Sequence, residues 1–149
     1  SWVDIGSSYL PGEVTAAFLW AQLEDAHLIT QKRKVVWSNY HQAFQDFEYI
    51  NRVQRPAIPE YSIHNGHIYF LLLKSIVERN SFIESMRLKG VHCVFHYIPL
   101  HSSPIGKKIG RTSGDLSITE DISGRLVRLP LWLGVDEKKV IQSTIECLA

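Results

Sequence analysis

An uninterrupted helical stretch constrains this chain more than any other feature. Residues 12–47 contain no proline and, beyond the first position, no glycine, and Pro11 suits the first turn of a helix. Over residues 14–23 apolar side chains occur on nearly every side, which predicts a helix that is buried all round. Later they narrow to a stripe at steps of three and four: Trp37, Tyr40, Phe44 and Phe47. We predict one long helix, or two with a bend, docked deeply at its start and shallowly at its end.

Two strands separated by a helix are predicted in the middle of the chain. Residues 68–73 are a continuous apolar and aromatic run of strand length. Ser81 and Glu84 have the spacing of a capping box, which predicts that a helix begins there, and Gly90 suits its left-handed C-terminal position. Residues 91–97 are rich in β-branched and aromatic side chains and predict the second strand.

The C-terminal third predicts a loop, two helices and an extended segment. Residues 102–114 are rich in Gly, Ser, Pro and Lys, which is typical of a loop, and residues 117–127 predict a helix. Residues 129–132 are expected to be extended because Pro130 disfavours a helical conformation before it. Asp136 is expected to cap a last helix. The apolar face of that helix comprises Val140, Ile141, Thr144, Ile145 and Leu148.

This order of elements predicts an α+β fold in which helices pack on a small, mostly antiparallel sheet. The 149 residues suffice for one domain, and 45% hydrophobic with 21% charged residues is typical of a globular one. We expect a leading loop and long helix over residues 1–47 and an α+β body over residues 48–149. Since the sequence does not begin with Met, we also expect a cut or processed piece of a longer protein.

Charge and hydropathy exclude several classes of partner. Sixteen Lys+Arg against fifteen Asp+Glu give a net charge of +1, which argues against binding to nucleic acid. No apolar run is long enough to cross a membrane, so no membrane partner is expected. Two cysteines, Cys93 and Cys147, are too few for a disulfide framework and fit a reducing cytoplasm.

The seven histidines raise the possibility of a metal site, which their spacing argues against. His92 and His96 share one face of the predicted strand but would lie ~13 Å apart, too far to hold one ion. No carboxylate lies near them in sequence, so we expect no metal. Cys93 is expected to point into the core, which argues against a nucleophilic role.

A denser cluster of polar aromatic side chains lies where the second strand ends. The segment of residues 95–101 holds His96, Tyr97 and His101, and functional groups often occur at such strand ends. Two interpretations stay open on the residues alone. The segment is either a strand end whose amphipathic side chains reach water or part of a binding site.

Three sequence blocks resemble a known family. These are VDIGSSYLPGEVTAAFLWAQLE near the start, VFHYIPLHSSP in the middle and GRLVRLPLW late in the chain. In order and spacing they are similar to the C-terminal third of DegT-type nucleotide-sugar aminotransferases, and the subgroup they most resemble is dTDP-4-amino-4,6-dideoxygalactose transaminase. The resemblance covers essentially the whole chain.

The resemblance implies the small C-terminal domain of a fold-type I enzyme that uses pyridoxal phosphate (PLP). Such an enzyme transfers an amino group from glutamate to a 4-keto nucleotide sugar in bacterial surface-polysaccharide synthesis, and it works as a cytoplasmic homodimer. Its N-terminal large domain carries the Schiff-base lysine. None of the eight lysines here has that sequence context, so we expect no catalytic residue in this chain and no activity from it alone.

The resemblance also implies roles for particular residues. Ser7, Ser8 and Tyr9 match a loop that reaches across the dimer to the PLP phosphate of the partner subunit. His96 and Tyr97 match a pair that faces the nucleotide-sugar pocket, and His101 matches a second histidine of that block. The resemblance implies a helix former such as Glu at position 124. The glycine found there instead indicates relaxed selection or close packing. The alternative is a freestanding, non-catalytic module that binds a nucleotide sugar or a partner protein.

Overall fold

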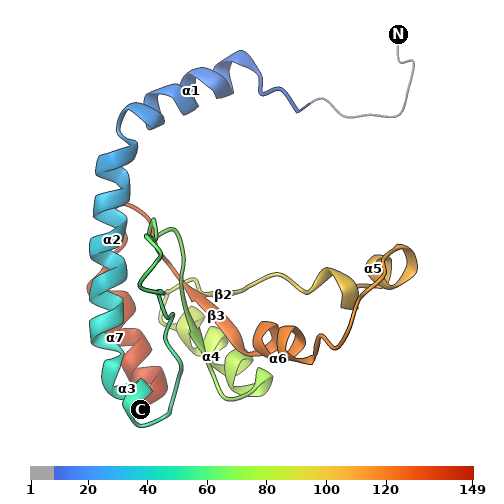
Figure 1. Cartoon of the computed structure of the whole chain (residues 1–149). Helices are drawn as coiled ribbons and strands as arrows, with labels where there is room; N and C mark the ends of the chain where they lie inside the picture. Colours follow the sequence, from blue (N-terminus) through green and yellow to red (C-terminus); the bar gives the residue numbers. More distant parts are fainter. Residues whose placement is uncertain (1–8) are drawn as a thin grey trace.

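A bent run of three helices forms one side of the molecule. The structure is a computed structural model that describes residues 9–149. Its first helices are α1 (Glu13–Glu24), α2 (Ala26–Ala43) and α3 (Gln45–Tyr49), interrupted at Asp25 and Phe44. The helical stretch predicted from the sequence is therefore present, with bends, and Figure 1 shows α1 extending away from the rest of the fold.

A three-stranded antiparallel sheet lies beside α2. Strand β3 (Leu126–Leu129) is central, with β1 (Tyr69–Leu72) on one side and β2 (Val94–Phe95) on the other. Side chains alternate between the two faces of a strand, so Tyr69 and Leu71 of β1 point into the core while Phe70 points outward. Across the ladder Phe70 lies opposite Arg128, and Val94 also lies opposite Arg128.

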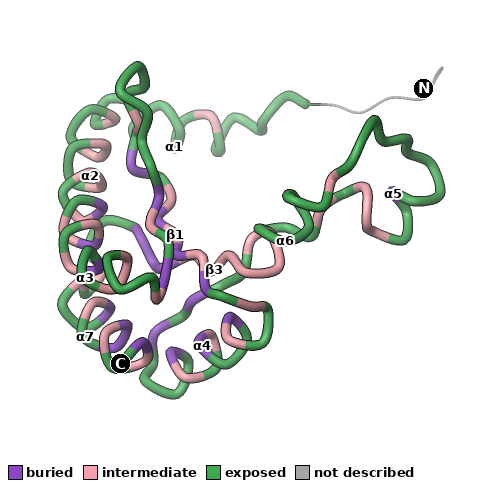
Figure 2. Tube along the Cα trace, turned by 60° about the horizontal axis from the view of Figure 1, so that its bottom comes forward, coloured by how far each residue is buried: buried purple, intermediate pink, exposed green. Residues whose placement is uncertain are grey.

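Helices cover the inner face of this sheet. They are α2, α4 (Ile76–Leu88) and α7 (Glu137–Leu148), and α6 (Ser117–Arg125) packs against α4. Figure 2 shows the buried positions gathered where these elements meet. The largest fully buried side chains are Tyr40, Tyr69, Phe44, Leu71, Met86, Val127 and Thr144. The predicted α+β class, with helices on a small antiparallel sheet, is confirmed.

The expected deep docking of the first helical segment is wrong for this chain. Helix α1 has no buried residue, and Val14 and Phe18 are 86% and 71% exposed. The second half of α2 docks instead, through Trp37 and Tyr40. Apolar side chains on every side of a helix predict burial, but nothing within residues 9–149 covers α1.

Three predicted element boundaries are also wrong. Helix α6 ends at Arg125 and β3 occupies Leu126–Leu129, whereas the sequence predicts a helix to residue 127 and an extended segment over residues 129–132. Helix α4 begins at Ile76, five residues before Ser81, because Ser75 is the N-cap and its hydroxyl accepts a hydrogen bond from the amide of Glu78. The second strand is limited to Val94–Phe95, and Arg128 of β3 is its partner at the first of these positions.

The predicted loop over residues 102–114 contains regular structure. The 3₁₀ helix η1 (Leu100–Ser102) leads into α5 (Pro104–Ile109). Ser103 caps α5 by accepting a hydrogen bond from the amide of Gly106, and Pro104 is its first residue. In Figure 2 this segment projects from the body beyond α6.

Other local signals are confirmed. Asp136 caps α7 by accepting a hydrogen bond from the amide of Lys139, and Gly90 ends α4 with a positive φ of 72°. Val140, Thr144 and Leu148 are buried on the predicted face of α7. Among residues 9–149 no helix is long and apolar enough to cross a membrane.

Candidate functional site

The polar aromatic cluster begins where β2 ends. Regular pairing stops at Phe95, so His96 and Tyr97 are not forced onto opposite faces. Their rings contact edge to face, with centroids 4.9 Å apart. Both side chains line a groove of about 440 Å³ whose other wall is α6, including Ile118 and Ile122. The structure therefore brings the two predicted substrate-binding residues together on one mostly apolar groove.

His101 lies on a different hollow. It belongs to η1, is half-buried, and lines a space of about 510 Å³ with Lys107 and Arg111. Its Nε2 atom is 3.3 Å from Oε1 of Glu120 in α6, and the two atoms are not aligned as a hydrogen bond. His101 thus lies next to α6, and the structure does not bring it into the groove of the His96–Tyr97 pair.

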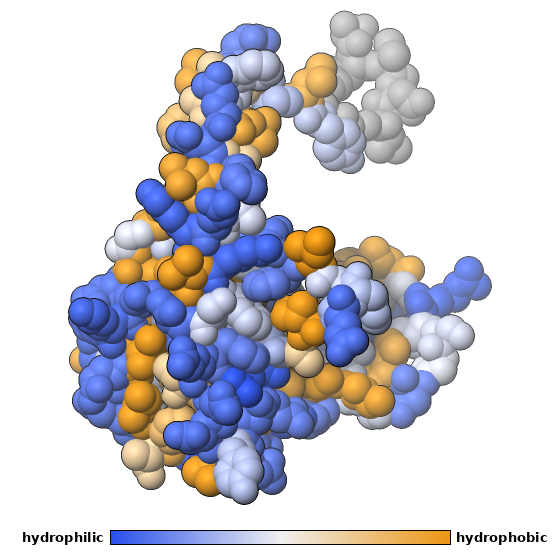
Figure 3. Space-filling model, turned by 60° about the vertical axis from the view of Figure 1, so that its left-hand side comes forward, coloured by the Kyte–Doolittle hydropathy of each residue, from blue (hydrophilic) through white to orange (hydrophobic). Residues whose placement is uncertain are grey.

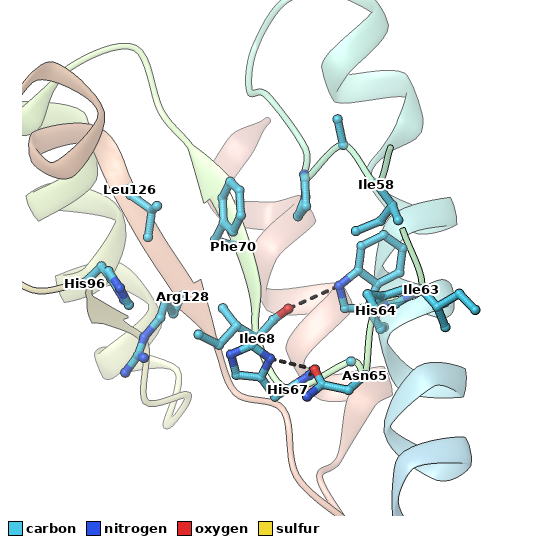
Figure 4. Close-up of a pocket in the computed structure, with 14 residues that line it drawn as sticks. Ile58, Ile63, His64, Asn65, His67, Ile68, Phe70, His96, Leu126 and Arg128 are labelled. Carbon is cyan, nitrogen blue, oxygen red and sulfur yellow. Dashed lines mark hydrogen bonds between the residues drawn. The ribbon is translucent and has the colours of Figure 1, made fainter. Parts of the chain in front are cut away.

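A larger cavity of about 550 Å³ opens on the outer face of the sheet. Its floor is formed by outward side chains of the strands, Phe70, Leu126 and Arg128, and its far wall by Trp37 and the loop before β1. Figure 4 shows His96 on the rim beside Arg128. Since His96 lines both this cavity and the groove, the two spaces are neighbours across one side chain.

The far wall of this cavity is held by hydrogen bonds to the backbone before β1. The indole nitrogen of Trp37 donates to the carbonyl of Ile68 at 3.1 Å, as drawn in Figure 4. Arg33 donates to the carbonyls of Gly66 and His67. Gly66 has a positive φ of 64°, and an added Cβ would lie 3.1 Å from the backbone nitrogen of Lys34. The turn at this glycine therefore lies close against α2.

His64 gives the cavity a neutral aromatic wall. Its ring lies 4.5 Å from that of Trp37, centroid to centroid. Burial, and then the nearby charge of Lys34, lower the pKa of His64 below its usual range. Arg128 gives this cavity a positive charge. It forms no ion pair with any residue between 9 and 149, so no carboxylate there offsets that charge.

Arg128 was missed as a candidate, although the sequence held a signal for it. It lies within the late block GRLVRLPLW between two apolar residues of a short strand. Val127 and Leu129 are buried, so alternation places Arg128 on the opposite face. A charged residue inside an apolar strand indicates that the second face of the sheet is not packed in the core.

The predicted cofactor loop is only partly described. Ser7 and Ser8 lie outside the described residues. Tyr9 is 92% exposed, and in Figure 1 the described chain begins on the extended arm that precedes α1. No residue between 9 and 149 forms a hydrogen bond with the Tyr9 side chain.

No lysine here has the surroundings of a Schiff-base group. All eight lysines fall within residues 9–149; Lys34 is half-buried and the other seven are exposed. A lysine nucleophile needs a lowered pKa, whereas the hydrogen bond from Lys89 to Glu146 raises the pKa of Lys89. The exposure of seven lysines and the raised pKa of Lys89 therefore argue against covalent attachment of an aldehyde cofactor at these positions.

Cys93 and the histidines were the other candidates for chemistry in the sequence. Burial raises the pKa of the Cys93 thiol to about 12, so the thiolate nucleophile is scarcely formed at neutral pH. No group of three His, Cys, Asp or Glu side chains among residues 9–149 is arranged to hold a metal ion. His92 and His96 both lie outside the short strand β2.

The sequence matches a family model over residues 2–148, described as the DegT/DnrJ/EryC1/StrS aminotransferase family. It is 26% identical over 143 residues to an uncharacterized protein of Methanocaldococcus jannaschii, covering 93% of this chain and 36% of that protein. It is 25% identical over 137 residues to dTDP-4-dehydro-2,3,6-trideoxy-D-glucose 4-aminotransferase of Saccharopolyspora spinosa, covering 92% and 34%. The chain thus spans about a third of the length of these relatives.

Solved structures share the fold. PseC of Helicobacter pylori, an aminotransferase involved in the biosynthesis of pseudoaminic acid, matches with a TM-score of 0.80 at 20% identity, over 99% of this chain and 40% of that one. NtdA of Bacillus subtilis, solved with bound cofactor PMP, matches with a TM-score of 0.68 at 18% identity, over 81% and 28%. Both likenesses cover a minor part of the longer chains.

Proposed function

Because this chain belongs to the DegT/DnrJ/EryC1/StrS aminotransferase family, we propose that it is the C-terminal portion of a PLP-dependent enzyme that moves an amino group from glutamate to a 4-keto-6-deoxy nucleotide sugar. A role in bacterial surface-polysaccharide synthesis, in the cytoplasm, is part of the proposal. The observation that carries it is the family match over nearly the whole chain, to relatives about three times as long.

In this proposal residues 1–149 form the small domain, and a large N-terminal domain supplies the cofactor and its lysine. PLP, when bound there, would supply the electron sink on which amino transfer depends. The lysines of this chain do not fit that task, so no step of the reaction is assigned to them. Ser7, Ser8 and Tyr9 are proposed to contact the cofactor phosphate of the partner subunit in a homodimer.

The proposed task of His96 and Tyr97 is to bind the nucleotide sugar. Both side chains line one groove, and both carry groups that donate hydrogen bonds to phosphate oxygens. The apolar residues of α6 on the opposite wall would exclude water from those bonds and thereby strengthen them. His101 is proposed to hold this segment in place through Glu120, and a direct contact with substrate is not needed for that role.

Exposure of α1 supports a large-domain partner and argues against the freestanding binding module. Five large apolar side chains on this helix are more than half exposed: Val14, Phe18, Leu19, Trp20 and Leu23. Figure 3 shows such hydrophobic side chains on the arm that projects from the body. A freestanding module would leave this surface in water, whereas a large domain or a dimer partner would cover it.

Reductive labelling tests the proposal. The purified chain is mixed with PLP, reduced with borohydride and digested, and labelled peptides are counted. We expect scattered, low-level labelling of exposed lysines, since none is buried. A single lysine labelled stoichiometrically would contradict the proposal that the Schiff-base group lies outside this chain.

The gene provides a second test. The proposal expects the encoded protein to carry an upstream domain with a PLP lysine, and expects that protein to transfer amino groups from glutamate. A protein that begins near Ser1 and binds a nucleotide sugar without transferring an amino group would favour the binding-module alternative instead.

A further inference from the structure

Arg79 in α4 is a buried cation without a counter-charge. Only 8% of the residue is exposed, and its guanidinium carbon lies 5.2 Å from the centroid of the Phe95 ring. Its Nε atom is buried and has no hydrogen-bond partner. Four other arginines each form an ion pair with a carboxylate: Arg52, Arg55, Arg87 and Arg125. Arg79 forms none with any residue between 9 and 149.

Such a position is unfavourable unless something compensates for it. Removing a guanidinium from water without an ionic partner has a large desolvation cost, and stacking on one aromatic ring recovers only part of it. Burial alone lowers the pKa of Arg79, with no neighbouring carboxylate opposing the change. No carboxylate within residues 9–149 therefore pairs with this side chain.

A hollow of about 400 Å³ lies directly beside this guanidinium. Its wall includes Arg79 and Asn80 of α4, Ser123 of α6, and Tyr97 from the segment after β2. Glu120 is the one acidic residue on the wall, and its Oε1 atom lies 3.3 Å from Nε2 of His101. An anion entering the hollow would meet neutral donors and the unpaired cation of Arg79, with the carboxylate of Glu120 on the same wall.

We propose that Arg79 is an oxyanion-binding residue, which donates hydrogen bonds to a phosphate or carboxylate group of a ligand in this hollow. Its planar guanidinium matches both groups in a two-pronged geometry that lysine does not reproduce. The inference rests on the proposed function in one respect, the identity of the ligand. The two substrates proposed there offer the diphosphate of the nucleotide sugar and a carboxylate of the amino donor. The diphosphate is favoured because Tyr97 lines both this hollow and the groove that it shares with His96.

Anion titration of the purified chain tests this directly. Inorganic pyrophosphate and L-glutamate are the two probes, and isothermal titration calorimetry measures their affinities. Arg79→Met is expected to weaken binding of pyrophosphate at least tenfold, since it removes one charge-assisted hydrogen bond or more. Arg79→Lys is also expected to weaken it, because the fork is lost. The matched control is Arg87→Met, an exposed position on the same helix that is expected to leave affinity unchanged.

Each outcome assigns or removes the role. A tenfold loss confined to glutamate would keep Arg79 as an oxyanion residue and identify the carboxylate as its ligand. Absence of binding by both probes, or equal losses in the Arg79 and Arg87 variants, would overturn the proposal. Neither result depends on amino transfer. The proposed function can therefore be wrong while Arg79 still binds anions, and Arg79 can fail to bind anions while the proposed function is correct.

Thermal unfolding separates binding from a structural role. Arg79→Met should unfold at a temperature equal to or above that of the wild type, because an uncompensated buried charge is replaced by an apolar side chain of similar length. Pyrophosphate should raise the unfolding temperature of the wild type and leave that of the variant unchanged. A lower unfolding temperature in the variant, together with an unchanged response to pyrophosphate, would show that Arg79 serves packing alone.

Discussion

The hydroxyl of Tyr40 donates a 2.8 Å hydrogen bond to the carbonyl oxygen of Pro130. Tyr40 is fully buried in α2, and Pro130 directly follows β3. This bond ties the long helical run to the strand that carries Arg128, so it helps to fix the distance between the two walls of the cavity on the outer face of the sheet.

Removing this hydroxyl should destabilise the fold. Tyr40→Phe leaves a buried carbonyl oxygen without its partner, which costs about 1–3 kcal/mol of unfolding free energy. Tyr49→Phe is the matched control, because Tyr49 is 91% exposed and should change stability little. Urea unfolding of the three proteins measures this, and equal stabilities for wild type and Tyr40→Phe would contradict it.

Two glycines should respond to alanine with opposite signs. At Gly124 in α6 an added Cβ would lie 4.0 Å from the Ile76 side chain, an ordinary contact. Gly124→Ala should therefore stabilise the fold by about 0.5–1 kcal/mol through helix propensity. The close packing considered at this position from the sequence is absent.

At Gly106 in α5 an added Cβ would lie 1.7 Å from the carbonyl oxygen of Leu100. Gly106→Ala must displace η1 or α5, so it should destabilise this segment. The pair is checked by thermal unfolding and by amide hydrogen exchange over residues 100–110. Equal effects of the two substitutions would contradict the packing described here.

The free energy of unfolding should fall as the pH drops below the ordinary pKa of histidine, about 6.5. His41 stacks on Trp37, with ring centroids 4.7 Å apart. Burial, and then the charge of Arg55, lower the pKa of His41. The unfolded chain therefore takes up this proton at a higher pH than the folded one. The stabilising contribution is complete above about pH 6.5 and is lost as the pH falls below it.

The substitution His41→Phe keeps a stacking ring and removes the titration. Its unfolding temperature should change less between about pH 7.5 and about pH 5.5 than that of the wild type. His27→Phe, at an exposed position on the same helix, is the control and should retain the wild-type dependence. An identical pH dependence in His41→Phe and wild type would remove His41 as its source.

The exposed face of α1 should drive association of the chain. We expect self-association or poor solubility at high concentration, together with binding of a dye that reports exposed apolar surface. Replacing both Phe18 and Trp20 with Glu should reduce both effects, whereas Trp132→Glu on the body should not. Sedimentation that shows a clean monomer for the wild type, without dye binding, would count against this.

Local signals predicted several helix ends because the residues involved act alone. Asp136 caps α7 and Gly90 terminates α4 with a positive φ, as expected from each residue type. Around the start of α4 the capping-box pattern Ser-x-x-Glu occurs twice, at Ser75 and at Ser81. The backbone is extended at Ser75, so the first copy begins the helix and the second lies inside it. The sequence pattern alone does not distinguish the copies.

Features set by tertiary placement were harder to predict. The apolar composition of α1 predicts that the helix is buried. It does not tell whether residues of this chain or of another domain or subunit pack on it. The His96–Tyr97 pair was found through a family resemblance and by its place at a strand end. Arg79 and Arg128 were missed, since one looks like any arginine of an amphipathic helix and the other like a surface strand residue. Only the structure shows that Nε of Arg79 has no hydrogen-bond partner and that Arg128 lines a cavity.

The most direct test concerns His96 and Tyr97 in the protein as its gene encodes it. Rates of the two half-reactions, with glutamate and with the nucleotide sugar, are measured separately for wild type, His96→Ala and Tyr97→Phe, with a melting curve for each. Contacts to the diphosphate persist from ground state to transition state, so each variant should raise KM for the nucleotide sugar roughly ten- to a hundredfold. The glutamate half-reaction should stay nearly intact. Unchanged KM in both variants, with lowered melting temperatures, would contradict the account and leave the segment a structural role.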